Sequence, residues 1–149
     1  MKNLTRREFT SAAAAIAATS LAAPAVAHSG VGRIVVVGGG FGGASAAKYA
    51  RIFGGEKVDV VLIEPNKTFY TCPFSNLVLG GLRDIRSIGH SFHAMGKRGV
   101  KVVHDVVTSV DSAKKTVAIS GGETIAYDRL VLAPGIDFRW DQIEGYDAA

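Results

Sequence analysis

The sequence predicts an α/β fold, a parallel sheet with a small antiparallel β insertion, on three observations. Two short runs rich in β-branched residues, Ile34–Val37 and Val58–Ile63, flank a segment that favours a helix. Both runs are largely apolar, as is usual for strands buried on both faces of a parallel sheet. From residue 100 onward, several short runs alternate apolar and polar residues, which indicates antiparallel strands.

The composition is that of a soluble globular domain. The chain has 149 residues, 48% of them hydrophobic, and a formal charge of +4. Residues 1–27 contribute +2 of that charge, which leaves +2 for the remainder. No basic stripe with interleaved aromatic residues occurs in the sequence, so we predict no nucleic-acid binding. Cys72 is the only cysteine, so the chain has no internal disulfide.

The first 27 residues have the pattern of an export signal. The pair Arg6 and Arg7 precedes an apolar run, Ala12–Leu21, and the small residues Ala25–Ala27 match a cleavage site. The paired arginines resemble a twin-arginine signal. A membrane anchor would need ~20 strongly apolar residues, so we expect no integral membrane segment in the mature chain. The twin-arginine route exports proteins already folded, which predicts a periplasmic protein with a bound cofactor.

A glycine motif follows the first predicted strand directly. It has the form Gly38-x-Gly40-x-x-Gly43, and the next residues, Ala44–Phe53, favour a helix. We expect Gly38 to make the turn out of the strand, Gly40 to let the backbone approach a pyrophosphate, and Gly43 to allow close packing of helix on strand. The pyrophosphate would lie over the helix N-terminus, where N–H groups and the helix dipole favour negative charge. The order strand, glycines, helix predicts a Rossmann-like dinucleotide site.

An acidic residue stands at the end of the second predicted strand. Glu64 lies 21 residues beyond Gly43, where a carboxylate can accept hydrogen bonds from the hydroxyls of an adenosine ribose. A carboxylate there disfavours a 2′-phosphate, and therefore NADP. The glycine motif and Glu64 leave both FAD and NAD open.

The second half of the chain favours FAD. A predicted strand, Val100–His104, precedes the antiparallel insertion, which has a hairpin turn at Ser120–Glu123. A further buried strand, Leu130–Ala133, ends at Pro134. The segment YDRLVLAPG resembles the second signature of two-dinucleotide flavoprotein oxidoreductases, which place FAD on the N-terminal glycine motif. In this chain a proline, Pro134, replaces the usual threonine.

Six segments together carry a more specific resemblance. The chain is similar to the flavoprotein subunit of flavocytochrome c sulfide dehydrogenase through VVVGGGFGG, LIEPN, YTCPFSNLVLGG, VVHD, YDRLVLAPGI and IEGYD. The likeness runs from Arg33 to Asp147. It implies FAD as the cofactor, sulfide as the electron donor and a c-type cytochrome subunit as the partner. The cofactor-binding residues implied are Gly38, Gly40, Phe41, Gly43, Glu64, Pro65, Cys72, Val107, Ala133 and Gly135.

The resemblance also suggests a role for the single cysteine. In that family the cysteine of the YTC segment is bound to the flavin 8α-methyl group by a thioether, and the matching residue is Cys72. We therefore expect covalent FAD at Cys72. The alternative is that Cys72 is a small buried apolar residue, which is the commonest role of a free cysteine.

The chain is shorter than the family resemblance requires. We expect residues 28–149 to be the N-terminal portion of an FAD-binding domain, with apolar sheet surface left uncovered. In the family, sulfide opens a redox cystine, and both of its cysteines belong to segments that this chain lacks. We therefore assign no catalytic residue and expect the chain alone to be incomplete for catalysis. The alternatives are a sulfide:quinone oxidoreductase-like flavoprotein and a non-catalytic FAD-binding remnant of a truncated gene.

Three histidines invite other roles. His90 and His93 are three residues apart, a helical spacing that could suit a metal ion. No further cysteine or carboxylate pattern completes such a site, so we predict solvent-facing or capping roles and no metal. His104 ends a predicted strand, and we expect it to be a hydrogen-bonded structural residue.

Overall fold

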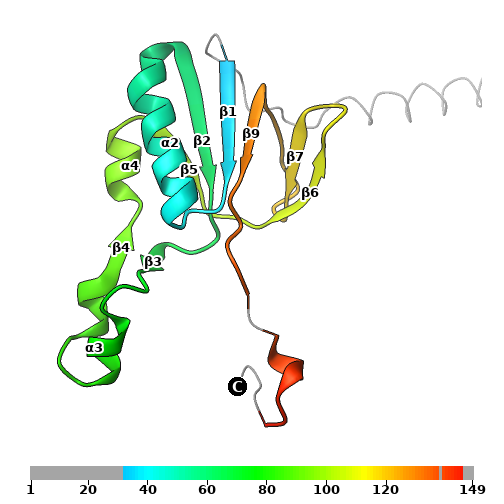
Figure 1. The fold of residues 1–149 in the computed structure, drawn as a ribbon. Coiled ribbons are helices and arrows are strands. Elements are labelled where there is room, and N and C mark those ends of the chain that lie inside the picture. The colour runs from blue at the N-terminus through cyan, green and yellow to red at the C-terminus, as the bar shows by residue number, and fades with distance from the viewer. Residues whose placement is uncertain (1–31, 138, 146–149) are drawn as a thin grey trace, which may run out of the picture.

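A four-stranded parallel sheet forms the centre of the computed structural model, which describes residues 32–137 and 139–145 (Figure 1). The predicted export signal, residues 1–27, lies outside the described residues. The strand order is β5-β2-β1-β9, and each neighbouring pair is parallel. The predicted α/β fold is therefore confirmed. The strands are β1 (Gly32–Val37), β2 (Val58–Ile63), β5 (Val100–Val103) and β9 (Arg129–Leu132).

Helices cover one face of this sheet. Helix α2 (Phe41–Gly54) and the short helix α4 (His93–Lys97) lie on the same side (Figure 1). Helix α2 begins at Phe41, three residues before the predicted start, because the carbonyl of Gly40 already accepts the first helical bond from Ala44 N–H at 2.9 Å. The glycine motif therefore supplies the first turn of the helix. The buried residues of this layer are Val36, Ala47, Val60, Leu62, Phe92 and Val100.

The predicted antiparallel insertion covers the opposite face. It consists of β6 (Val107–Asp111), β7 (Thr116–Ile119) and β8 (Thr124–Ala126), in that order. The predicted hairpin turn at Ser120–Glu123 lies between β7 and β8, as expected. Alternate side chains of β1 and β2 face this insertion, so these two central strands contribute to a core on each side of the sheet. The second core consists of Val35, Val61, Ile63, Val117, Ile119 and Ile125.

Residues 68–91 project away from the sheet and are here named the Cys72 arm (Figure 1). The arm contains a two-stranded antiparallel pair, β3 (Thr68–Tyr70) and β4 (Gly89–Ser91). Between them lie helix α3 (Ser75–Leu79) and a 3-10 helix, Ile85–Ile88. Within the arm, Ile88 alone is buried. The arm therefore has almost no core of its own.

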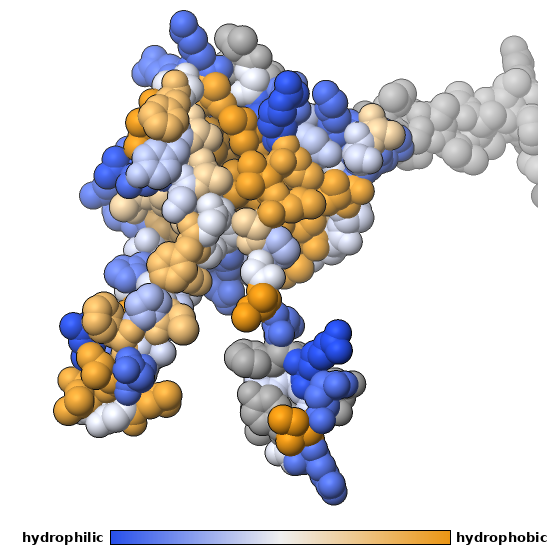
Figure 2. Space-filling model, in the orientation of Figure 1, coloured by the Kyte–Doolittle hydropathy of each residue, from blue (hydrophilic) through white to orange (hydrophobic). Residues whose placement is uncertain are grey.

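Apolar side chains remain at the surface beside α2. Figure 2 shows them gathered over β1 and β9. Leu132, at the end of β9, is 61% exposed, while Ile34 and Val131 are half-buried. Two further 3-10 helices, Gly55–Lys57 and Trp140–Gln142, complete the described elements. Among the described residues, no helix has the length and apolar character needed to cross a membrane.

Candidate dinucleotide-binding site

The carboxyl ends of the four parallel strands meet at one edge of the sheet. Gly38 follows β1, Glu64 follows β2, His104 follows β5 and Ala133 follows β9. In open α/β sheets, ligands bind in the crevice outside this edge. Four of the chain segments singled out by the sequence therefore converge where the fold class places a ligand.

Two glycines of the motif are required by the packing of the chain itself. Gly38 has a φ of +95°, which L side chains rarely adopt, and its N–H donates to the carbonyl of Ile63 at 2.9 Å. A Cβ at Gly43 would overlap the carbonyl oxygen of Gly38. These positions match the predicted roles of turn and close packing. Gly40 differs, because a Cβ there would meet Phe69 only at 3.7 Å. Its role beside a pyrophosphate stays a prediction.

The N-terminus of α2 carries no side-chain cap. The N-cap residue is Gly40, which has no side chain to accept a hydrogen bond, and the first turn contains no acidic residue. The first N–H groups of a helix have no intrahelical partner, and the helix dipole adds positive potential there. A phosphate group placed at this end would therefore meet both hydrogen-bond donors and a favourable dipole.

Three hydrogen bonds hold the carboxylate of Glu64. Its Oε2 accepts from the N–H of Gly39 at 2.7 Å. Its Oε1 accepts from the N–H of Asn66 at 2.9 Å and from the side-chain Nδ2 of Asn66 at 2.8 Å. Oε2 of Glu64 is thus hydrogen-bonded to the glycine turn, and Oε1 is hydrogen-bonded to the loop that follows Glu64.

A hollow of about 280 Å³ lies between the ends of the central strands and the insertion. Four of the residues predicted to bind the cofactor line it together: Gly38, Glu64, Pro65 and Val107. The sequence analysis named neither Asn66 nor Asp105 as a site residue. The available signal was their place in the segments LIEPN and VVHD, which carry the family resemblance. The remaining lining residues are Val37, Ile63, Val106 and Pro134.

Asp105 connects this hollow to the insertion. Its carboxylate accepts from the N–H of Val106 at 2.7 Å, from the N–H of Gly121 at 3.0 Å and from the hydroxyl of Ser120. These donors, the Ser120 hydroxyl foremost, hold the pKa of Asp105 below its ordinary value. Asp105 therefore attaches the turn between β7 and β8 to the segment that leads into Val107.

Three other predicted residues do not line this hollow, and two of them, Ala133 and Phe41, lie at the glycine motif. The N–H of Ala133 donates to the carbonyl of Val37 at 2.8 Å, which places Ala133 against the turn at Gly38. Gly135 follows with a φ of +79°. Phe41 is 58% exposed and its ring stands edge-on to Phe69, with centroids 5.2 Å apart. Ala133 thus borders residues 38–43, here named the glycine cradle. Phe41 lines a separate hollow of about 250 Å³ at the start of α2.

Cys72 lies in the arm and is exposed. Its carbonyl accepts from the N–H of Ser75 at 3.0 Å, in the turn before α3. The neighbours Thr71 and Pro73 line a hollow of about 300 Å³ together with Phe41. The alternative interpretation of Cys72 as a buried apolar residue is therefore wrong. Covalent attachment of FAD to this thiol stays a prediction.

The structure places the three histidines on or directly after different elements. The helical spacing of His90 and His93 does not place them on one helix, because His90 lies in β4 and His93 begins α4. Nδ1 of His104 lies 3.0 Å from the carbonyl oxygen of Glu64, as expected for a hydrogen-bonded structural residue. Among the described residues no group of three potential metal ligands occurs.

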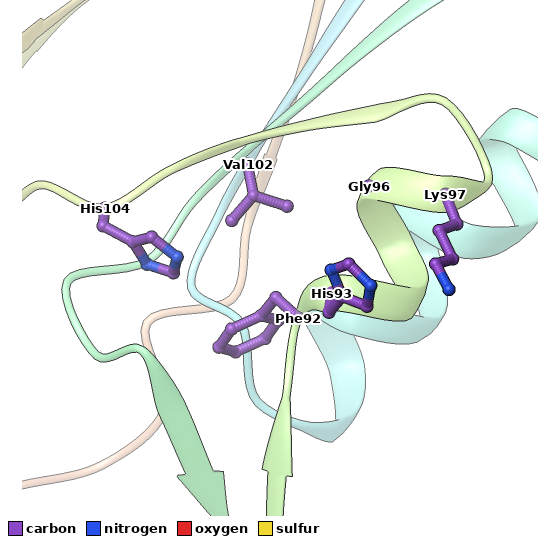
Figure 3. Close-up of a pocket in the computed structure, with 6 residues that line it drawn as sticks. All are labelled: Phe92, His93, Gly96, Lys97, Val102 and His104. Atoms are coloured by element: carbon purple, nitrogen blue, oxygen red, sulfur yellow. The ribbon is translucent and has the colours of Figure 1, made fainter.

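A further hollow of about 460 Å³ lies beside the outer strand β5. Figure 3 shows His93 and Lys97 on α4 and His104 after β5 around it, with Phe92 between them. None of its lining residues belongs to the predicted cofactor-binding set. The hollow at Glu64 is therefore the candidate site.

A family model matches the chain over the described sheet and its insertion. The model described as pyridine nucleotide-disulphide oxidoreductase matches residues 32–148, most of the chain. The chain belongs to this family.

Two individual relatives are proteins of the kinds that the sequence analysis named. The chain is 33% identical over 115 residues to a mitochondrial sulfide:quinone oxidoreductase of Dictyostelium discoideum, covering 77% of this chain and 25% of the relative. It is 59% identical over 49 residues to a sulfide dehydrogenase [flavocytochrome c] flavoprotein chain of Chlorobaculum thiosulfatiphilum, covering 33% of this chain and 100% of the relative. The second match confirms the resemblance predicted from the motifs.

A solved structure shows the same fold. The sulfide:quinone oxidoreductase of Aquifex aeolicus superposes with a TM-score of 0.67 at 27% identity, over 71% of this chain and 25% of that one. The chain thus spans about a quarter of the length of this family member and of the Dictyostelium relative.

Proposed function

We propose that the chain is the FAD-binding N-terminal portion of a sulfide-oxidising flavoprotein. The observation that carries the proposal is the hollow at the strand ends, where Gly38, Glu64 and Val107 lie together. The match to the sulfide dehydrogenase flavoprotein chain supports the substrate class. When bound, FAD accepts two electrons from a reduced donor and passes them on.

The described residues fit the adenosine end of FAD. Glu64 offers a carboxylate for the ribose hydroxyls, and its attachment to Gly39 keeps it at the glycine turn. The uncapped N-terminus of α2 suits the pyrophosphate, and Gly40 leaves space for its approach. In this proposal the residues bind and orient the cofactor, and none of them reacts with sulfide.

The flavin end is proposed to lie toward the Cys72 arm. One hollow is lined both by Phe41 of the glycine motif and by Thr71 and Pro73, the residues on either side of Cys72 in the sequence. An exposed thiol on a projecting loop can reach an oriented flavin, which supports a thioether at Cys72. A covalent link would prevent loss of the cofactor outside the cytoplasm.

Export and the electron acceptor belong to the same proposal. The twin-arginine pattern of residues 1–27 supports delivery of the folded flavoprotein to the periplasm. The name of the Chlorobaculum relative supports a c-type cytochrome as partner and acceptor. A quinone acceptor is the second candidate, and the longer match to the Dictyostelium sulfide:quinone oxidoreductase favours it.

The mass of the intact chain tests the cofactor proposal. The chain is produced with FAD available, denatured in acid and measured by mass spectrometry, followed by peptide mapping. We expect the mass to rise by one FAD, with the added mass on the peptide that contains Cys72. The matched control, Cys72→Ser, should bind FAD but release it on denaturation. A wild-type chain that releases all its FAD would contradict covalent attachment, and one that never binds FAD would contradict the proposal as a whole.

A further inference from the structure

Asn66 contacts the candidate ribose-binding carboxylate at two points. Its backbone N–H and its side-chain Nδ2 both donate to Oε1 of Glu64, at 2.9 and 2.8 Å. Asn66 also lines the hollow at the strand ends. Asn66 is the last residue of the LIEPN segment, but the sequence analysis gave it no role.

The two carboxylate oxygens of Glu64 accept different numbers of hydrogen bonds. A carboxylate offers about four acceptor positions, two on each oxygen. Oε1 already accepts two bonds from Asn66, whereas Oε2 accepts one, from Gly39. The remaining acceptor position is therefore on Oε2, the oxygen bound to the glycine turn.

We propose that Asn66 is a positioning residue for nucleotide binding, acting through Glu64. By occupying Oε1 it prevents rotation of the carboxylate and keeps Oε2 available to one ribose hydroxyl. The inference rests on the proposed function, since it needs an adenosine ribose in the hollow. It goes further by naming the residue that determines how Glu64 meets that ribose.

The neighbouring chain explains why a separate residue is needed. Glu64 is only half-buried, so no apolar contact encloses its carboxylate on every side. Pro65 has no N–H and cannot donate to it. Asn66 is the first residue of the loop that can supply both a backbone and a side-chain donor. Replacing its amide removes one of the two donors to Oε1 while the backbone N–H remains.

Calorimetric titration of the full chain with ADP and with 2′-deoxy-ADP and 3′-deoxy-ADP tests the proposal. For the wild type we expect one of the two deoxy nucleotides to bind more weakly than ADP. Asn66→Ala should weaken ADP binding about five-fold, the value of one ordinary hydrogen bond. It should also reduce the preference for the ribose hydroxyl. Asn76→Ala, the same change on α3 in the Cys72 arm, should leave both quantities unchanged.

A double-mutant cycle separates an indirect role from a direct one. In a Glu64→Gln background, Asn66→Ala should have little further effect on ADP affinity, because its route of action is already removed. Equal losses in both backgrounds would overturn the inference, as would an Asn66→Ala chain that keeps the wild-type affinity and preference. A wild type that binds ADP without regard to either hydroxyl, or not at all, would instead overturn the proposed function. Thermal melting of each variant verifies that it is folded.

Discussion

The parallel sheet and the Cys72 arm are held together in different ways. In the sheet, β1 and β2 are buried on both faces, with Val35 and Val61 fully inaccessible to solvent. In the arm, residues 68–91, the large apolar side chains of Phe74 and Leu79 are 56% and 89% exposed. Burial of apolar surface is the main stabilising contribution to folding. The sheet and its glycine cradle therefore have their own source of stability, whereas the arm buries little apolar surface of its own.

Two arginine–aspartate pairs make this difference measurable. Arg33 is 1% exposed and its Nε donates to Asp59 at 2.7 Å, whereas Arg86 and Asp84 form a comparable bond on the surface of the arm. Arg33→Met should lower the free energy of unfolding by about 4 kcal/mol, because it leaves Asp59 without its buried partner. Arg86→Met should change it little, since water replaces the lost contact. Denaturant unfolding of both variants provides the comparison, and equal losses would contradict it.

Adjacent glycines test how tightly the cradle is packed. Gly43→Ala should lower the free energy of unfolding by about 3 kcal/mol, because the added Cβ overlaps the carbonyl oxygen of Gly38. Gly42→Ala is the matched control, since its Cβ would meet the nearest atom at 4.0 Å. We expect this control to be neutral or slightly stabilising, as alanine favours a helix. If thermal melting showed the same loss for both, packing against Gly38 would not be the reason for Gly43.

Acid should weaken the attachment of the insertion before it affects the arm. The pKa of Asp105 lies below its ordinary value of 3.8 because Ser120, Val106 and Gly121 donate to it. A carboxylate of this kind contributes its full stabilisation when the pH is above the pKa that it has in the unfolded chain. The contribution is lost as the pH falls through the lower pKa that it has in the folded chain. The melting temperature should therefore decrease as the pH is lowered from about 4. Asp105→Asn should make the melting temperature less dependent on pH in this range.

Asp84 is the control for the pH experiment. Its pKa is also lowered, chiefly by the side chain of Arg86. That partner is two residues away, so the same contact can form in the unfolded chain, whereas Ser120 is 15 residues from Asp105. Asp84→Asn should leave the acid dependence of melting nearly unchanged. A larger effect from Asp84 than from Asp105 would contradict the proposed difference between sheet and arm.

The smallest expected effect on stability is that of the cysteine. Cys72→Ser should change the free energy of unfolding by less than about 0.5 kcal/mol, because the side chain is exposed. Val61→Ala, in the buried strand β2, should lower it by roughly 2 kcal/mol. Chemical denaturation of the apo chain checks both values. A large loss for Cys72→Ser would show that the thiol packs against the fold after all.

Local sequence patterns predicted much of the fold and of the site. The apolar runs identified β1 and β2, and the glycine spacing placed the start of the helix within three residues. Gly38 and Glu64 were predictable because their roles depend on backbone conformation and on position at a strand end. Asn66 and Asp105 were not, because their contacts join Glu64 and Ser120, and a single sequence contains no record of such pairings.

The sequence by itself determined the strand–helix–strand start of the sheet, its later strands with the insertion, the glycine cradle and the family, since these follow from periodicity and from motifs with fixed spacing. Only the tertiary structure decided that His90 and His93 belong to different elements. It also decided that Cys72 is exposed and that Asn66 holds Glu64. Burial and hydrogen-bond partners depend on residues distant in the chain that folding brings together. Hydrophobic patterning indicates which side chains turn inward, but it does not specify which polar groups they bring into contact.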